Sequence, residues 1–479
     1  RHPGKRGLGV AGLSPDETEA LDLAAEIAKA YRADVAERPV GAALSYPDVL
    51  ARFREALPRN GTAAREVVAD LARRAEGGLL GTVSPNFHGW VIGASHPVGV
   101  AADWLASAWG QAPGFADIGP AAAAAEEVAG DWIVDLLGLP EGAAVGFATG
   151  ATMANFTALA AARTHLLDAA GWDVEAKGLF GAPAVNVVLG GEAHSSIFLT
   201  LRYLGFGAER VHVAASDAQG RMRPDALEAV LSGLRGPTMV VLQAGNVNSG
   251  AFDPFPDLIG LARGAGAWVH VDGAFGLWAA AAPSLHGLTD GMAAADSWAA
   301  DAHKWLQAPY DCGVAIVRDG AAMRRAMGST AAYLPQVERR NPCDLAPELS
   351  RRARGFPVWA ILKHLGRDGL AEMIERHCAV ARHIAGLVAA EPGLSVLNAV
   401  VLNQVVVACG AGDDPRSDAL TRQTLAAVQA DGKAYPSAGH WRGRDVMRIS
   451  VSSGPATLAD GARTADAVIS AWRSVRAQV

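Results

Sequence analysis

The ionisable residues Asp272 and Lys304 lie in the segment 267–305, much of which has the composition of an apolar core. Val269 to Val271 predict a buried parallel strand that places Asp272 at its carboxyl end, where ligand sites of open α/β sheets gather. Lys304 follows a second such segment, and a partly desolvated lysine loses its proton more readily and becomes a nucleophile. A lysine and an aspartate in one pocket are what a pyridoxal phosphate enzyme needs, the lysine to carry the cofactor and the aspartate to pair with its pyridinium nitrogen.

Small residues at Gly150, Ala151 and Thr152 precede a helix that we predict from about Met153. The first turn of a helix offers unpaired N–H groups and positive dipole to a phosphate, and small side chains let the backbone approach it. Many tight turns share this pattern, so it indicates a phosphate site only together with its neighbours.

His194 follows a predicted strand at 185–190 and opens a predicted helix. The residue could simply neighbour a helix cap. In a parallel sheet, however, it would lie in the same layer as Asp272 and Lys304, where an imidazole can stack on a planar ring or hold a substrate carboxylate.

The stretch from Gly81 to Gly110 is rich in glycine and aromatic residues. We interpret His96 as part of a packed loop before a helix that starts at Pro97. The other residues of interest are equally compatible with a packed loop and with the wall of a substrate pocket: Phe87, His88, Trp90, Val91 and Ile92.

Five short β-branched runs alternate with helical patterns between residues 185 and 319. This alternation predicts an α/β fold with a mostly parallel central sheet and helices on both faces. We expect three parts: a helical N-terminal segment at 1–99, a large cofactor-binding domain at 100–357 and a smaller α+β domain at 358–479. In the last part we expect Arg448 to be an ion-paired structural residue.

The composition bounds the class of protein. The chain has 479 residues, half of them hydrophobic, and a formal net charge of -7 without long runs of like charge, so no nucleic-acid or anionic-membrane surface is indicated. Four widely spaced cysteines form neither metal-ligand pairs nor a disulfide framework, which favours a reducing cytoplasm. No apolar run reaches membrane-spanning length without charges or glycines.

The motifs HVDGAFGLW and DAHKW resemble those of the group II pyridoxal phosphate decarboxylases, the family of the aromatic L-amino acid and glutamate decarboxylases. The likeness runs from SPNFHGW through VMRISVS in the family's order. It implies pyridoxal phosphate fold type I, that of aspartate aminotransferase, and a homodimer with the active site at the subunit interface, for which the helical N-terminal segment is a suitable intertwining arm.

The resemblance also implies roles for individual residues. Lys304 matches the Schiff-base lysine, Asp272 the partner of the pyridine nitrogen, and His194 the histidine that stacks on the ring. Ala274 matches the small residue at the other face of the ring. The phosphate-binding residues implied are Gly150, Ala151, Thr152 and His303. Asn246 lies at a position that contacts the cofactor's lower half.

Tyr333 lies where these decarboxylases carry a mobile-loop tyrosine that protonates the carbanion, although a packed surface tyrosine competes with this interpretation. Retention of both His194 and Tyr333 favours decarboxylation over the aldehyde-forming branch of the family. The segment Trp90 to Gly93 does not reproduce the pocket of the aromatic amino acid decarboxylases, and the glutamate decarboxylases' pattern for a distal carboxylate is missing. We therefore expect an aromatic or apolar amino acid as substrate.

Two kinds of alternative remain open at this point. The same cofactor apparatus could perform retro-aldol cleavage, transamination or oxidative deamination, because a fold fixes the cofactor and not the reaction. A catalytically silent paralogue that serves as a binding partner is the alternative from another class.

Overall fold

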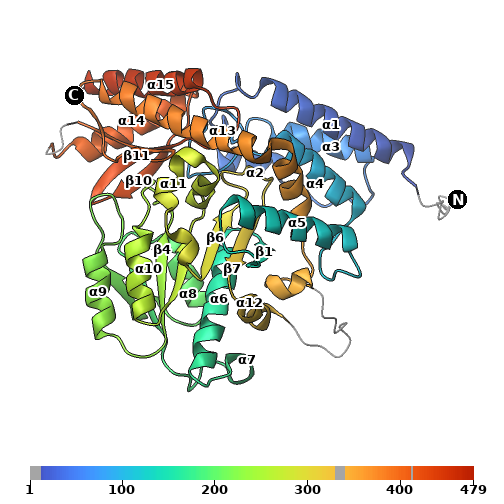
Figure 1. Cartoon of the computed structure of the whole chain (residues 1–479). Coiled ribbons are helices and arrows are strands. Elements are labelled where there is room, and N and C mark those ends of the chain that lie inside the picture. Colours follow the sequence, from blue (N-terminus) through green and yellow to red (C-terminus); the bar gives the residue numbers. More distant parts are fainter. Residues whose placement is uncertain (1–11, 329–339, 411–413, 479) are drawn as a thin grey trace.

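The computed structural model describes residues 12–328, 340–410 and 414–478. Its larger sheet has seven strands in the order β1-β7-β6-β5-β4-β2-β3 (Figure 1). Their bounds are β1 (Ala144–Ala148), β2 (Asn186–Gly190), β3 (Val211–Ala214), β4 (Thr238–Gln243), β5 (Trp268–Asp272), β6 (Ser297–Asp301) and β7 (Gly313–Val317). The five neighbouring strands β3, β2, β4, β5 and β6 pair in parallel, whereas β7 pairs antiparallel with β6 and β1. The predicted mostly parallel sheet is therefore confirmed.

Both faces of this sheet are buried. In β4, Val240 and Leu242 belong to one hydrophobic cluster, while Met239 and Val241 belong to another on the opposite face. Helices cover each face, as near-continuous apolar strands require. Their bounds are α4 (Pro97–Trp109), α5 (Pro120–Leu136), α6 (Ala151–Ala169), α7 (Val174–Lys177), α8 (Ser195–Tyr203), α9 (Pro224–Gly233), α10 (Phe255–Gly264), α11 (His286–Thr289) and α12 (Gly320–Met327).

The N-terminal segment contains three separate helices. Helix α1 (Pro15–Asp34) begins with a capping box of Ser14 and Glu17. Helix α2 (Tyr46–Phe53) ends at Arg54, which is in extended conformation, and α3 (Ala64–Ala75) begins only after Pro58 and Gly61. Proline lacks the N–H that a helix interior needs, which explains the break.

The smaller sheet has the order β10-β11-β9-β8 and is antiparallel throughout. Its strands are β8 (Leu394–Val396), β9 (Gln404–Cys409), β10 (Ser437–Trp441) and β11 (Arg444–Ser450), and its helices are α13 (Gly355–Ala389), α14 (Ser417–Asp431) and α15 (Leu458–Arg476). Helix α13 departs from helical geometry at Gly366, where φ is 62°. The predicted division into three domains stays a prediction.

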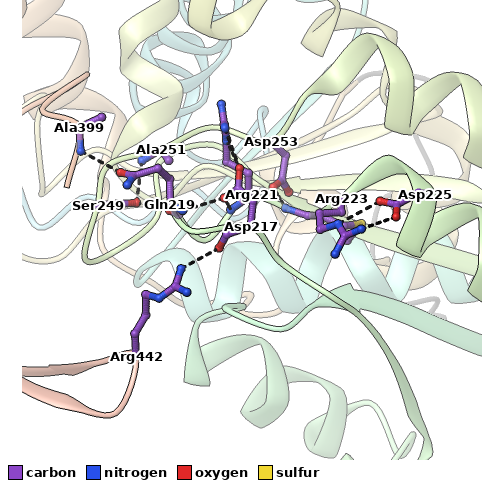
Figure 2. Close-up of polar contacts among 11 residues, drawn as sticks. Asp217, Gln219, Arg221, Arg223, Asp225, Ser249, Ala251, Asp253, Ala399 and Arg442 are labelled. Atoms are coloured by element: carbon purple, nitrogen blue, oxygen red, sulfur yellow. Dashed lines mark hydrogen bonds and ion pairs between the residues drawn. The ribbon is translucent and has the colours of Figure 1, made fainter. Parts of the chain in front are cut away.

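A loop between β3 and α9 joins the two sheets (Figure 2). The carbonyl of Asp217 accepts from Arg442 at 3.3 Å, and the side chain of Gln219 accepts from the backbone of Ala399 at 2.8 Å. Buried Asp253 anchors the far end of this loop, because its carboxylate accepts the backbone N–H groups of Met222 at 2.7 Å and Gln243 at 2.8 Å. One carboxylate thereby ties the loop to β4.

No described helix is both long and apolar enough to cross a bilayer. All four cysteines are buried and free.

Burial raises the pKa of Asp253 to about 6, above its usual 3.8, although the two N–H donors oppose the rise. The folded protein therefore keeps this proton between those values while the unfolded chain releases it, so the stability it contributes is lost as pH rises through about 6. We expect Asp253→Asn, which cannot titrate, to gain up to about 3 kcal/mol relative to the parent between about pH 4 and about pH 7 in urea unfolding. Asp225→Asn, at an exposed site, is the control; a pH-independent difference for Asp253→Asn would contradict the assignment.

Candidate active site

The carboxyl ends of the parallel strands border a cavity of about 260 Å³. Asp272 ends β5 and Asp301 ends β6, and the link from β6 to β7 carries Lys304. Eight of the predicted cofactor contacts line this cavity: Gly150, Ala151, Thr152, His194, Asp272, Ala274, His303 and Lys304. Four segments far apart in the sequence therefore meet at one edge of the sheet.

Lys304 is paired with an acid that the sequence analysis did not single out. Its Nζ lies 2.9 Å from Oδ2 of Asp301, whose side chain is only 3% exposed. Oδ1 of Asp301 accepts the backbone N–H of Ala151 at 2.5 Å and lies 3.4 Å from Nε2 of His303. Asp301 ends a strand just as Asp272 does, so the strand-end rule could have identified it.

Asp272 is buried, and burial raises the pKa of its carboxyl group. Three neighbours act in the opposite sense: the charges of His194 and Lys304 and the side chain of Asn155 all lower this pKa. The backbone N–H of Ala274 also donates to Oδ1 at 3.3 Å. A carboxylate in such a place is costly unless a cation or donors face it, and a protonated pyridine nitrogen is a cation of the right size.

Helix α6 begins at this cavity with Gly150 as its extended N-cap, which offers no side-chain cap. The first backbone N–H of the helix, that of Ala151, donates to the carboxylate of Asp301. The helix therefore shows the anion-binding chemistry expected of its first turn.

The His194 ring is held in one orientation as the N-cap of α8. Its Nδ1 accepts the backbone N–H of Ser196 at 3.2 Å and lies 2.8 Å from that residue's hydroxyl. Nε2 then carries the proton of the neutral ring. Burial lowers the pKa of His194, which favours this neutral form.

Two of the five predicted substrate-pocket residues, Trp90 and Val91, line the cavity. Both have left-handed backbone conformations, with φ of 53° and 58°, a strain of about 1–3 kcal/mol each that packing must offset. Phe87 instead stacks on Tyr435, with ring centroids 5.6 Å apart. Two neighbours bind the C-terminal part of the chain: buried His88 contacts Thr464 Oγ1 at 2.8 Å, and the carbonyl of Ile92 accepts from Ser452.

Two further expectations meet a different geometry. Asn246 does not line the cavity, because its side-chain oxygen accepts the N–H groups of Asn248 and Ser249 and its nitrogen donates to Gln243. The prediction that Arg448 is ion-paired is wrong for the described residues. Its guanidinium donates instead to the carbonyl of Val247 and to the side-chain oxygen of Asn248. Tyr333 lies outside the described residues.

These residues fit pyridoxal phosphate. An amine at Lys304, an acid at Asp272 and an oxyanion-binding helix end at Gly150 to Thr152 surround one cavity. Neutral His194 and small Ala274 also border it, as two faces of a flat ring would require. The aldehyde, the ring nitrogen and the phosphate of the cofactor thus each have a partner of suitable chemistry.

Comparisons with known proteins agree with this fit. The family model described as the pyridoxal-dependent decarboxylase conserved domain matches residues 47–408. The aromatic-L-amino-acid decarboxylase of Bacillus atrophaeus is 28% identical over 72% of this chain and 72% of its own length, and the phenylacetaldehyde synthase of Arabidopsis thaliana is 27% identical over 81% and 82%. A crystal structure of Oryza sativa TDC with PLP and tryptamine has a TM-score of 0.90 at 24% identity and covers 97% of this chain and 99% of that one, which shows the shared fold.

Substitution of Gly93 tests whether the loop that carries Trp90 and Val91 holds Lys304 in place. A Cβ atom at Gly93 would overlap the carbonyl oxygens of Lys304 and His303. We expect Gly93→Ala to displace Lys304 and lower activity by about a hundredfold, since misplacement by 1 Å can cost that much. Bound-cofactor absorbance and borohydride labelling of Lys304 should fall as well. Gly61→Ala, where a Cβ meets nothing within 4 Å, is the control, and full loading of Gly93→Ala would refute the role of this contact.

Proposed function

From the premise that this chain belongs to the pyridoxal-dependent decarboxylase family, we propose that it converts an aromatic or apolar L-amino acid to the amine and carbon dioxide. That it is an amino acid decarboxylase and uses pyridoxal phosphate follows from the family. The substrate class is the proposal. It rests chiefly on one observation: the cavity that holds Asp272 and Lys304 also has apolar side chains in its wall, namely Trp90, Val91, Val247 and Phe275.

Each residue has a role that its surroundings support. Lys304 would hold the cofactor through its amine, Gly150 to Thr152 would hold the phosphate, and Asp272 would keep the ring nitrogen protonated. When bound, the cofactor supplies an electron sink for the bond that breaks. His194 would lie against the ring and use its Nε2–H to orient the substrate carboxylate, with Ala274 at the other face.

The final proton transfer is assigned to Tyr333, with His194 as the second candidate. A general acid placed at the cavity would return a proton to the carbon that loses carbon dioxide. The aldehyde-forming reaction is the main alternative, because a relative that matches 81% of the chain is named phenylacetaldehyde synthase.

We also propose a cytoplasmic homodimer in which the N-terminal segment contributes to the interface. Helix α3 exposes Val67 and Leu71, one turn apart, at 50% and 57%. Apolar residues that share a helix face in this way are typical of a surface covered by a partner. Four free buried cysteines suit a reducing compartment.

Lys304→Ala should abolish turnover, because no other amine of the described residues lines the cavity. We expect product formation below detection and a cofactor that is removed by dialysis. Lys433→Ala, at an exposed lysine paired with Asp431, should behave as the parent. A Lys304→Ala enzyme that cycles at the parental rate would refute the assignment.

Tyr333→Phe tests the proton donor and the reaction type together. With a mixed amino-acid pool in aerated buffer, we expect amine formation to fall about a hundredfold, as loss of a general acid predicts. Aldehyde and ammonia should appear, with dissolved oxygen as the oxidant that is reduced to hydrogen peroxide. Tyr203→Phe, at an exposed tyrosine on α8, is the control. Unchanged amine output without aldehyde would remove Tyr333 from the mechanism, while aldehyde from the parent enzyme would favour the alternative reaction.

A further inference from the structure

A chain of buried hydrogen bonds runs through the sheet toward Asp272. It starts at Nε1 of Trp268, which donates to Oγ of Ser297 at 2.9 Å. Oγ of Ser297 lies 2.9 Å from Nδ1 of His270, and Nε2 of His270 lies 2.7 Å from Oδ1 of Asn155. Ser297, His270 and Asn155 are fully buried, so water does not compete for these contacts.

The direction of the chain follows from its first member. An indole N–H can only donate, so Ser297 accepts from Trp268 and is free to donate its own proton to Nδ1 of His270. Nε2 of His270 then carries the ring proton and donates to Asn155. Burial lowers the pKa of His270 to about 3, which keeps the ring neutral and makes one nitrogen a donor and the other an acceptor.

The last link reaches Asp272. With Oδ1 of Asn155 engaged by His270, its amide nitrogen remains as a donor, and this buried nitrogen has no full hydrogen bond to any described residue. The Asn155 side chain nevertheless lowers the pKa of the Asp272 carboxyl group, as a donor that faces it would. The reverse direction would turn the amide oxygen toward the carboxylate, which is electrostatically unfavourable.

We propose that Ser297, His270 and Asn155 are positioning residues that hold Asp272 as an anion aimed at the cofactor's ring nitrogen. The inference rests on the proposed role of Asp272 and extends it to residues that touch neither cofactor nor substrate. The other titratable groups that face Asp272 are His194 at the start of α8 and Lys304 after β6. Neither replaces a neutral donor: His194 is held in its neutral form by burial, and Lys304 is paired with Asp301.

The consequence concerns one proton. A buried acid and a ring nitrogen share it either as carboxylate and pyridinium or as carboxylic acid and neutral ring. A donor to the carboxylate favours the first arrangement, so its loss moves the proton from the ring nitrogen to Asp272. The neutral ring is the weaker electron sink.

The test is the ring nitrogen itself. Holoenzyme is reconstituted with pyridoxal phosphate labelled with ¹⁵N in the ring, and the chemical shift of this nitrogen is followed by solid-state NMR from about pH 6 to about pH 9. We expect a protonated nitrogen throughout in the parent. In Asn155→Ala we expect the pKa of the ring nitrogen to fall by about one to two units, so that the nitrogen loses its proton within this pH range. A shift of this size corresponds to the loss of one hydrogen bond to a charged group. In Ser297→Ala we expect a smaller fall.

The control is a histidine that is as buried as His270 but is not part of the hydrogen-bond chain toward Asp272. His377 is equally buried and accepts from Trp305 at 2.9 Å, so His377→Asn should cost stability without a change in the ring nitrogen. Thermal unfolding and cofactor loading are measured for every variant, and Ser297→Ala keeps the test available if Asn155→Ala does not fold. A parental shift in both network variants would overturn this inference alone. A neutral nitrogen in the parent itself would instead overturn the proposed role of Asp272.

Discussion

Burial of both faces of the seven-stranded sheet is the constraint on which the site depends. Alternate residues of β4 enter different hydrophobic clusters, so no polar group is tolerated within the strands unless it has a partner. Charged side chains are therefore confined to the ends of strands, where Asp272 and Asp301 are the last residues of the neighbouring strands β5 and β6. The active site is the place where the sheet can accommodate charge.

The charges gathered there are balanced in a specific way. Asp301 joins the start of α6 to Lys304, because its two oxygens serve the Ala151 N–H and the lysine amine. Among the described residues Asp272 has no such direct ion pair, and the donors around it leave it available for the cation that we propose the cofactor supplies. The two acids thus differ in their partners although both end neighbouring strands: Asp301 contacts the lysine amine and the start of α6, and Asp272 contacts neither.

The wall of the cavity comes from outside the sheet. The loop that carries Trp90 and Val91 is held by contacts to the C-terminal part of the chain, among them the hydrogen bond from Ser452 to Ile92. Gly93 abuts the backbone of Lys304, so the same loop touches Lys304 and lines the cavity in which we propose that the substrate binds. The choice of substrate and the placement of the lysine are therefore mechanically connected.

The sequence alone determined the fold class, the position of Asp272 at a strand end and of Lys304 after a strand, and, to within two residues, the helix start next to Gly150, because apolar runs and small-residue turns are local signals. His270, which looked like part of a core strand, and Asp301 acquire meaning only from partners on other elements. The direction of the Phe87 to Ile92 side chains likewise depends on Tyr435, Thr464 and Ser452, more than three hundred residues away along the chain. Asn246 was placed by its motif, yet its loop consumes the amide. Spacing predicts where a side chain begins, whereas packing against distant segments decides what it contacts.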